Sequence, residues 1–401
     1  MHLPPQQLAE NLPALWQLRP DVAFLNHGSF GAVPRAVAAA QEQWRQRIEA
    51  EPIEVLARRS PELLETVRLK LGQYLHTSPA NLGLVTNATE AVNSVVRDFP
   101  LRPGDELLTT DHVYNAVRQT MRHTARRAGA EVHEVAIPLP VSCSADIADR
   151  VIAALTPRTR LLVIDHITSP TALVFPVADI IRECRRRGVD VLVDGAHAPG
   201  MIGLDLDDLA PAFYTGNLHK WLCAPRGSAF LYVHPDHQRQ AHAPVISHDL
   251  DHGFTREFAW QGTRDLSAWF AIPAAIDFLA QFGHDAVRRH NFELCRWAHE
   301  LLCTRLAVEP ISPLDGRLLG SIATVRLPAR RDGSHWPDFQ QRLYDEHRIE
   351  VPLVWWNEQA FVRTSSHIYN RPEEYERLAG VLESLAVNRP RGGRPGEEEP
   401  G

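Results

Sequence analysis

Lysine is the residue that this sequence almost lacks. Only Lys70 and Lys220 occur among the 42 basic residues, so the other 40 (42 minus 2) are arginine. An arginine side chain cannot form a Schiff base, because its guanidinium stays protonated, whereas a lysine amine can lose its proton in suitable surroundings. Lys70 falls in the amphipathic pattern at 61–75, which is typical of a surface helix. Lys220, between His219 and Trp221, lies in a predicted loop and is the candidate for chemistry, with an ordinary surface lysine as the alternative.

Three further absences limit the class of protein. The formal net charge of −7 leaves no basic surface of the kind that binds nucleic acid. No apolar run approaches the roughly 20 residues of a membrane helix, and the N-terminus lacks a charged-then-apolar secretory pattern. The five cysteines are odd in number and lack paired metal-ligand spacing, so we expect no metal site and a reducing, cytoplasmic location.

Strand and helix patterns alternate through the first two thirds of the chain, which predicts an α/β fold with a doubly wound, mostly parallel sheet. Apolar, β-branched runs predict strands at 21–25, 82–86, 105–110, 131–136, 160–164, 189–193, 212–215 and 228–233. Helical periodicity predicts helices at 34–50, 61–75, 87–96, 115–128, 145–154 and 176–187.

The pattern also predicts how the chain divides. We expect an N-terminal arm at 1–20, a large domain at 21–265 and a smaller α+β domain at 266–388. Residues 389–401 contain almost no apolar side chains and are predicted to be disordered. A polar stretch at 235–258 is predicted to be a loop that covers the functional site described below. The smaller domain is predicted to contain a long helix at 267–306 with a break near Gly283, helices at 336–346 and 372–386, and strands at 321–327 and 360–365.

Two functional side chains are predicted at one edge of this sheet. Asp194 ends the strand at 189–193, and Lys220 follows the strand at 212–215. In open α/β sheets, sites form at the carboxyl ends of the strands. A buried carboxylate that pairs with a pyridine nitrogen and a lysine that forms a Schiff base are together what pyridoxal phosphate (PLP) requires. The sequence therefore indicates PLP as a cofactor.

A phosphate site is predicted where the strand at 82–86 enters the next helix. Asn87, Ala88 and Thr89 open this helix. The first turn of a helix presents free backbone N–H groups and the positive end of the helix dipole, which suit a phosphate. An asparagine or threonine in this position can also serve only as a helix cap. Both interpretations stay open for this motif.

The segment Asp194-Gly195-Ala196-His197, followed by His219-Lys220-Trp221, resembles class V aminotransferases, which are fold-type I PLP-dependent transferases. Within that family the chain is most similar to the branch that contains isopenicillin N epimerase and several cysteine C–S lyases or desulfhydrases. The resemblance covers roughly residues 20 to 388. Further matching segments occur in the family's order: Asn26-His27-Gly28-Ser29-Phe30-Gly31, Asn87-Ala88-Thr89-Glu90-Ala91, Asp165-His166-Ile167-Thr168-Ser169-Pro170-Thr171, Gly262-Thr263-Arg264-Asp265 and Phe361-Val362-Arg363-Thr364-Ser365.

The resemblance implies specific roles around the cofactor. His112 matches a position from which an aromatic ring stacks on the pyridine ring, and Ser169 stands where many members have asparagine near the phenolic oxygen. Thr263 matches a segment that reaches the phosphate of a neighbouring subunit, which implies a homodimer with composite active sites. The remaining cofactor contacts that the resemblance implies are Ala88, Thr89, Asp194, His197, Asn217, His219 and Lys220.

The resemblance also implies how an amino-acid substrate binds. Arg363 matches the arginine that grips the substrate carboxylate, a contact that suits the fork of a guanidinium. Asn26 and His27 match a segment beside the substrate. Tyr114 or His112 would serve as the acid on the face opposite Lys220, although Tyr114 can equally be a packing residue.

The expected activity is chemistry at the α-carbon of an amino acid, through an aldimine with Lys220 and a quinonoid intermediate, as in isopenicillin N epimerase. The alternatives are a C–S β-lyase (desulfhydrase) that acts on a cysteine derivative, and an aminotransferase. A protein that binds the cofactor without catalysis would require Lys220 to be dispensable. Between Cys303 and Arg363 there is no cysteine, which argues against a desulfurase that forms a protein persulfide.

Overall fold

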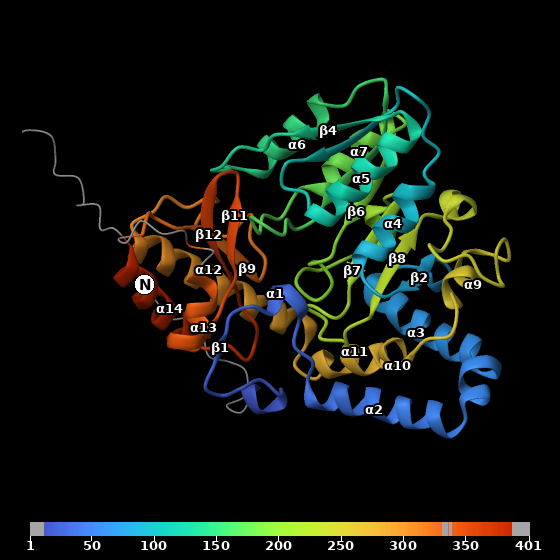
Figure 1. Cartoon of the computed structure of the whole chain (residues 1–401), viewed down its shortest axis with the longest axis horizontal. Coiled ribbons are helices and arrows are strands. Elements are labelled where there is room, and N and C mark those ends of the chain that lie inside the picture. The colour runs from blue at the N-terminus through green and yellow to red at the C-terminus, as the bar shows by residue number, and fades with distance from the viewer. Residues whose placement is uncertain (1–11, 331–335, 337–338, 387–401) are drawn as a thin grey trace, which may run out of the picture.

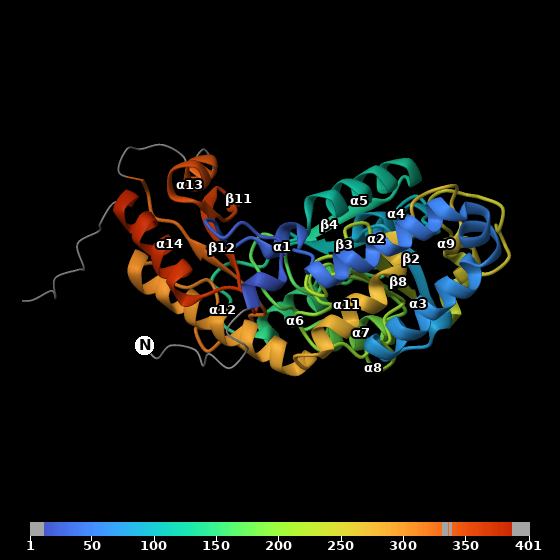
Figure 2. The same cartoon turned by 90° about the horizontal axis from the view of Figure 1, so that it is seen from below.

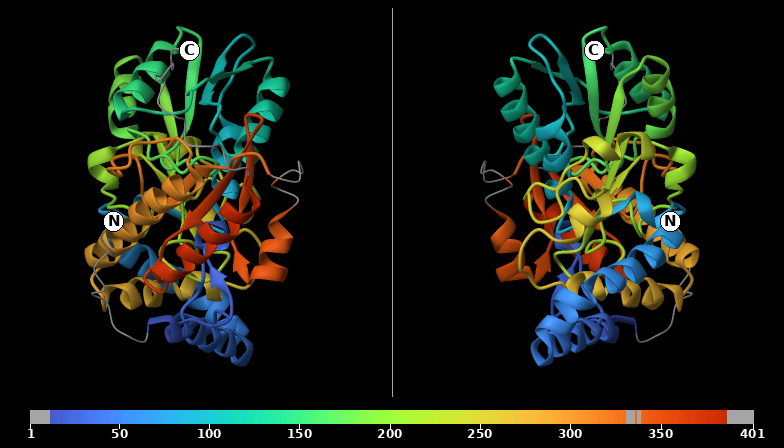
Figure 3. Two further views of the ribbon diagram at one scale, coloured as in Figure 1. Left: turned by 90° about the vertical axis from the view of Figure 1, so that its left-hand side faces the viewer. Right: turned by 90° about the vertical axis from the view of Figure 1, so that its right-hand side faces the viewer.

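The computed structural model describes residues 12–330, 336 and 339–386 (Figure 1). The first eleven residues of the predicted arm, and the tail at 389–401, lie outside the described residues. A seven-stranded sheet with its helices forms one part of the molecule, and a three-stranded sheet with its own helices lies beside it (Figures 1 and 2). Side views show the N-terminal helices, in blue, at the lower end of the molecule (Figure 3).

The seven-stranded sheet confirms the predicted α/β architecture. Its strand order is β2-β8-β7-β6-β5-β3-β4. β8 is antiparallel to both of its neighbours, and the other neighbouring strands are parallel. The strands span Leu82–Val85 (β2), Glu106–Thr110 (β3), Glu131–Val135 (β4), Thr159–Asp165 (β5), Asp190–Asp194 (β6), Phe213–Asn217 (β7) and Ala229–Val233 (β8).

Both faces of this sheet are covered, as its apolar strands require. Leu161 and Val163 of β5 pack in one core cluster with residues of α4 and α5. Leu162 and Ile164 point to the opposite face and pack in a second cluster with α2, α3, α6 and α7. These helices span Arg35–Ala50 (α2), Ser60–Leu75 (α3), Ala88–Asp98 (α4), Asn115–Ala128 (α5), Ser144–Ala153 (α6) and Val177–Arg186 (α7).

The polar stretch at 235–258 is not the continuous loop over the site that its composition suggests. It contains a 3-10 helix, η4 (Pro235–Gln240), and the start of α9 (Phe254–Ala259). Phe254 and Phe258 of α9 pack against Gly83 of β2, where a Cβ atom would lie 2.9 Å from the Phe258 ring. The apolar side chains of this short helix, which the sequence prediction overlooked, therefore cover the edge of the sheet.

The long helix predicted at 267–306 is divided twice. Its predicted break falls at Gly283, which has a φ of +78°, and a second break occurs at Ala271. The three helices are α10 (Ser267–Phe270), α11 (Ile272–Ala280) and α12 (His284–Leu306).

The C-terminal part is an antiparallel sheet in the order β11-β12-β9, with α12 and α14 packed together. β11 was not predicted. Ala23 and Leu25 pack in the core cluster of this part, and β1 pairs with β10, so the division between 21–265 and 266–388 stays a prediction. The elements are β1 (Ala23–Phe24), β9 (Ile322–Arg326), α13 (Gln340–His347), β10 (Ile349–Glu350), β11 (Leu353–Trp356), β12 (Gln359–Ser365) and α14 (Pro372–Leu385).

Short elements connect the larger ones. They are η1 (Leu12–Leu15), α1 (His27–Phe30), a π-helical turn η2 (Glu54–Arg58), η3 (Pro79–Asn81) and α8 (Leu206–Leu209). Within the described ranges, no helix is both long enough and apolar enough to span a bilayer.

Candidate active site

The carboxyl ends of three neighbouring strands bring polar side chains together. Asp194 ends β6, and it pairs with Asp165 of β5 on one side and with Thr215 of β7 on the other. Asn217 is the last residue of β7. Because side chains alternate along a strand, Asp194 shares the face of Leu192, which packs toward α4 and α5. The site therefore lies on this face, at the edge where the sequence predicted it.

Asp194 is buried and has one backbone partner. Its Oδ1 atom accepts a hydrogen bond from the N–H of Ala196 at 3.0 Å. Burial raises the pKa of Asp194, while the Ala196 N–H and the positive charge of Lys220 oppose this rise. A buried carboxylate with few partners gains most from a cation placed against it, which is what a protonated pyridine nitrogen offers.

Lys220 carries an amine that loses its proton near neutral pH. Burial and, next, the charge of Arg363 lower its pKa from 10.5 to about 7, while Asp194 and Asp165 oppose the change. An uncharged amine is nucleophilic and can attack an aldehyde, whereas an ammonium group cannot.

The contacts of His197 support the same charge state for Lys220. The indole N–H of Trp221 donates to Nδ1 of His197 at 3.3 Å, so Nδ1 must be an acceptor. Burial lowers the pKa of His197 well below its usual value, so this ring is neutral and its proton is on Nε2. Nε2 lies 3.2 Å from Nζ of Lys220 and donates to it. An amine that accepts a hydrogen bond has a free lone pair and is therefore not protonated.

His27 lies behind Lys220. Its Nε2 atom lies 3.0 Å from the backbone carbonyl of Lys220, and its Nδ1 atom lies 2.8 Å from the hydroxyl of Tyr369. Both ring nitrogens of this fully buried side chain are thus occupied by the protein. This arrangement favours a role in holding the backbone of Lys220 over the direct substrate contact that the resemblance implied for His27.

His27, Cys223 and His367 form a buried group whose potential ligand atoms lie within 4.8 Å of one another. The rings of His27 and His367 are stacked, with centroids 4.4 Å apart and planes inclined by 22°. An imidazole nitrogen binds a metal in the plane of its ring, so two stacked rings do not converge on one ion. The group is better described as packing beneath the lysine than as a metal site.

Arg363, on β12, is a buried cation whose hydrogen-bond partners are all uncharged. Its Nη1 atom donates to the carbonyl of Ser169 at 2.6 Å and to the Ser169 hydroxyl at 3.0 Å, and Nη2 donates to the hydroxyl of Ser29 at 3.2 Å. Among the described residues its Nε atom has no hydrogen-bond partner, and burial lowers the pKa of the guanidinium to about 10. A guanidinium in this setting is suited to bind a carboxylate.

Asn26 reaches this arginine through Ser29. The Ser29 hydroxyl donates to Oδ1 of Asn26, and Nδ2 of Asn26 donates to Glu350 at 2.9 Å. The sequence analysis quoted Ser29 in a motif but gave it no role. Its contact with Arg363 joins residues 334 positions apart, which no local pattern reveals.

His112 and Tyr114 have different environments. His112 is fully buried, with Nδ1 at 2.6 Å from the Thr171 hydroxyl and Nε2 at 2.8 Å from the Ile137 carbonyl, and its ring lies against Trp356. Tyr114 precedes α5 and is 46% exposed, and it lies close enough to Arg363 to raise the pKa of that guanidinium. Since both nitrogens of His112 are occupied, Tyr114 is the better placed of the two to exchange a proton with a ligand.

The remaining predicted cofactor residues surround the start of α4. The side chain of Asn87 caps the helix by accepting from the N–H of Glu90 at 2.9 Å. The N–H of Ala88 donates to Oδ1 of Asn217 at 2.8 Å, which holds the helix start against the end of β7. Thr89 lies in the first turn of α4, and His219 uses Nδ1 to bind the carbonyl of Ser228, which leaves its Nε2 available.

Thr263 lies in the segment between α9 and α10. It follows Gly262, which has a φ of +102°, and its side chain is exposed. Within the described part of the chain, it forms no side-chain hydrogen bond with the residues around Lys220. This position is compatible with the predicted contact with a second subunit.

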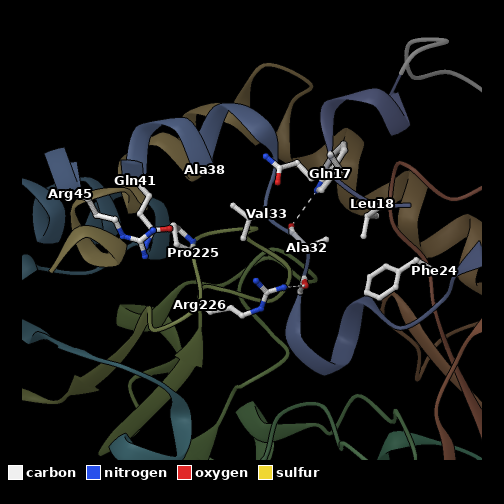
Figure 4. A pocket seen from close by; sticks show the side chains of 12 residues that line it. Gln17, Leu18, Phe24, Ala32, Val33, Ala38, Gln41, Arg45, Pro225 and Arg226 are labelled. Carbon is white, nitrogen blue, oxygen red and sulfur yellow. Dashed lines mark hydrogen bonds between the residues drawn. The ribbon is translucent and has the colours of Figure 1, made fainter. Parts of the chain in front are cut away.

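The pocket drawn in Figure 4 lies next to this site but is separate from it. It has a volume of about 460 Å³ and is lined by Phe24, Gly31, Gln41 and Arg226, among others. Gly31, with a φ of +68°, forms the wall: a Cβ atom here would lie 1.9 Å from the carbonyl oxygen of His219.

These residues fit PLP. The orphaned Oδ2 atom of Asp165 and the sparsely bonded carboxylate of Asp194 suit a protonated ring nitrogen, and the uncharged amine of Lys220 suits an aldehyde. At the start of α4 the N–H groups of Ala88 and Glu90 are engaged by Asn217 and Asn87, so Thr89 is the residue of this turn that suits a phosphate. The site thus combines the three features that the cofactor requires.

Comparison with known proteins agrees with this assignment. The family model for aminotransferase class-V matches residues 24–378. The chain is 37% identical to the isopenicillin N epimerase of Amycolatopsis lactamdurans, over 92% of this chain and 96% of that protein. It is 30% identical to a probable chloroplastic L-cysteine desulfhydrase of Arabidopsis thaliana, over 91% of this chain and 83% of that protein.

Among solved structures, a variant of C-DES with glycine covalently linked to its PLP cofactor superposes with a TM-score of 0.77. It is 21% identical and covers 94% of this chain and all of that chain (100%). At this identity the match supports the fold alone. Together with the family match, the geometry at Lys220 and Asp194 leads to one conclusion: the chain belongs to the class-V aminotransferase family and is a PLP-dependent enzyme.

Proposed function

We propose that this enzyme is an epimerase that inverts the α-carbon of an amino acid. The observation that carries the proposal is the uncharged amine of Lys220, which lies near two buried charged groups. One is the carboxylate of Asp194, and the other is the guanidinium of Arg363, whose hydrogen-bond partners are uncharged. Two isopenicillin N epimerases, at 37% and 34% identity, support this choice among the reactions of the family.

The proposed roles follow from the contacts of each side chain. PLP, when bound, stabilises the electron pair that remains at the α-carbon after a bond to it breaks. Asp194 supplies the negative charge against the ring nitrogen, and Arg363 binds the substrate carboxylate through its fork. Lys220 removes the α-proton on one face, because its amine is already unprotonated. The cofactor would be held by Ala88, Thr89, His112, Ser169, Asp194, His197, Asn217, His219 and Lys220.

Inversion needs a second proton donor on the face opposite Lys220. We propose Tyr114 for this role, since its phenol is exposed and lies close to Arg363, whereas both nitrogens of His112 are occupied. In this proposal His112 packs against the cofactor ring. Asn26 positions Arg363 through Ser29, and His27 positions Lys220 through its carbonyl.

A C–S β-lyase that acts on a cysteine derivative is the second candidate. Cysteine desulfhydrases at about 30% identity favour it, and Tyr114 would then protonate the leaving sulfur. Transamination is the third candidate. A cysteine desulfurase is disfavoured, because four of the five cysteines are buried and burial raises the pKa of Cys184 and Cys303 to about 12, which keeps these thiols unreactive.

Isotope exchange separates these reactions. The enzyme, reconstituted with PLP, is incubated with single L-amino acids in D2O, and the products are followed by proton NMR and chiral chromatography. Deuterium at the α-carbon with both enantiomers and no keto acid supports the epimerase, whereas pyruvate and sulfide from L-cysteine support the lyase. Lys220→Ala should abolish either activity, and Lys70→Ala, the matched control at the other lysine, should retain it.

We also propose that the enzyme is a homodimer with composite active sites, to which the partner contributes Thr263. Phe30 and Trp355 support an interface, because they are 70% and 53% exposed. Light scattering should give twice the chain mass. If Thr263 acts across the interface, mixed dimers of Lys220→Ala and Thr263→Ala subunits retain one intact site each, so an equal mixture should recover about a quarter of the wild-type activity. Absence of recovery would place both residues in the same subunit's site.

The five cysteines form no disulfide, which supports a reducing, cytoplasmic location. We propose neither nucleic acid nor a membrane as a partner. Fractionation of cells that express the enzyme would test its location, and recovery of the activity in the membrane pellet would contradict it.

A further inference from the structure

A second carboxyl group lies beside Asp194. Asp165 is the last residue of β5, and the register of the sheet pairs it with Asp194, the last residue of β6. Neighbouring strands lie about 4.8 Å apart, and side chains at paired positions point to the same face. Val163, two residues before Asp165, packs toward α4 and α5, as does Leu192 before Asp194. Both carboxyl groups therefore face the cofactor side of the sheet.

Asp165 has fewer partners than its burial requires. Its side chain is 3% exposed, and among the described residues its Oδ2 atom has no hydrogen-bond partner. The charged groups near it are Asp194 on β6, Arg118 on α5 and Lys220 after β7. Arg118 is already engaged by Glu134 at 3.0 Å. Burial, and then the charge of Asp194, raise the pKa of Asp165 well above its usual value.

Two adjacent buried carboxyl groups do not both ionise without a cation, so the pair holds one proton near neutral pH. A cation placed between them removes this restriction. We propose that Asp165 is a second carboxyl group of the cofactor site and that the Asp165–Asp194 pair loses its shared proton when the protonated ring nitrogen of PLP binds beside it. This inference rests on the proposed function, in which Asp194 faces that nitrogen.

The step balances with solvent as the proton acceptor. Free PLP already carries a proton on its ring nitrogen near neutral pH, so the O–H bond of the Asp165 carboxyl breaks, the proton goes to solvent, and two carboxylates then face one cation. No other reactant is required. An enzyme without Asp165 has no such proton to release when PLP binds, and that difference can be measured.

The test is calorimetric titration of the cofactor-free enzyme with PLP near neutral pH, in two buffers that differ in ionisation enthalpy. The wild type should release about one proton per site that Asp165→Asn does not release, so the net proton uptake of the variant should be higher by about one. Asp190→Asn is the matched control: it changes an aspartate at the opposite end of β6, and its proton uptake should equal that of the wild type. Equal uptake by Asp165→Asn and the wild type would overturn the inference.

A measurement on the wild type covers the case in which Asp165→Asn does not fold. The infrared difference spectrum between the free and the PLP-bound enzyme should lose the stretching band of a protonated carboxyl group. An unchanged band would overturn the inference while leaving the proposed function intact. If the wild type forms no visible Schiff-base band with PLP, both the proposed function and this inference fail.

Discussion

The charge of Lys220 depends on Trp221, and the substitution Trp221→Phe tests this dependence. In the wild type the indole N–H fixes the proton of His197 on Nε2, from which it is donated to the lysine amine. Phenylalanine has no N–H group, so His197 can then place its proton on Nδ1 and accept a hydrogen bond from an ammonium group. We therefore expect the pKa of Lys220 to rise in this variant from its wild-type value of about 7.

The size of the rise follows from the hydrogen bond that changes. A hydrogen bond between neutral groups contributes about 0.5–1.5 kcal/mol, and 1.36 kcal/mol corresponds to one pH unit, so we expect a rise of roughly 0.4–1.1. The chain suits a direct assay, because it contains two lysines. In protein with 13C-labelled lysine, the carbon next to Nζ gives two resonances, and Lys70→Ala removes one and so assigns the other to Lys220.

Trp16→Phe is the control. Trp16 is also a fully buried tryptophan whose indole N–H donates a hydrogen bond, in this case to the carbonyl of Ala32 at 3.2 Å. The control should lose packing in a similar way but leave the pKa of Lys220 unchanged. A wild-type pKa near 10, or equal values in the wild type and Trp221→Phe, would refute the assignment of an uncharged amine held by His197.

Three other substitutions have defined outcomes. Arg363→Gln removes the charged fork, and the loss of two charge-assisted hydrogen bonds should lower kcat/KM by on the order of 10²–10⁴-fold in steady-state assays. Gly31→Ala places a Cβ atom 1.9 Å from the His219 carbonyl at a φ of +68°, so it should lower both the melting temperature and the PLP content. Lys220→Met should stabilise the cofactor-free enzyme by about 3 kcal/mol more at pH 6 than at pH 9, as measured by chemical denaturation at each pH. The sign follows from the pKa of Lys220, which burial lowers from 10.5 to about 7. Between pH 7 and pH 10.5 the folded wild type therefore binds fewer protons than the unfolded chain, so Lys220 destabilises the fold more as the pH falls.

The sequence predicted the large sheet and the edge at which the site lies. Its strands are apolar runs bounded by turn residues, and the order of a doubly wound sheet follows from the alternation of strands and helices. Asp194 was found because it directly follows such a run, and Lys220 because it lies in the loop after the next run and because lysine is so rare in this chain. These are local signals, which a single sequence retains.

The features that the sequence analysis missed depend on tertiary contacts. Ser29 acquires a role only because β12 brings Arg363 against it. Asp165 gains significance from its register with Asp194, which is set by the sheet and not by spacing along the chain. The state of His197 likewise depends on the contacts of its two nitrogens. β11 escaped prediction because its burial is irregular and it is stabilised by pairing with β12.

One turn of helix, α1, touches both groups that would anchor a substrate. His27 contacts the carbonyl of Lys220, the N–H of Gly28 donates to the hydroxyl of Ser365, and the hydroxyl of Ser29 accepts from Arg363. A substitution in this turn therefore affects both the nucleophile, Lys220, and the residue proposed to bind the substrate carboxylate, Arg363. Its effects should combine non-additively with changes at Lys220 or Arg363, because the residues share one network. Evolutionary changes in substrate preference would then require paired substitutions, because a substitution in α1 alters the effect of a later substitution in β12.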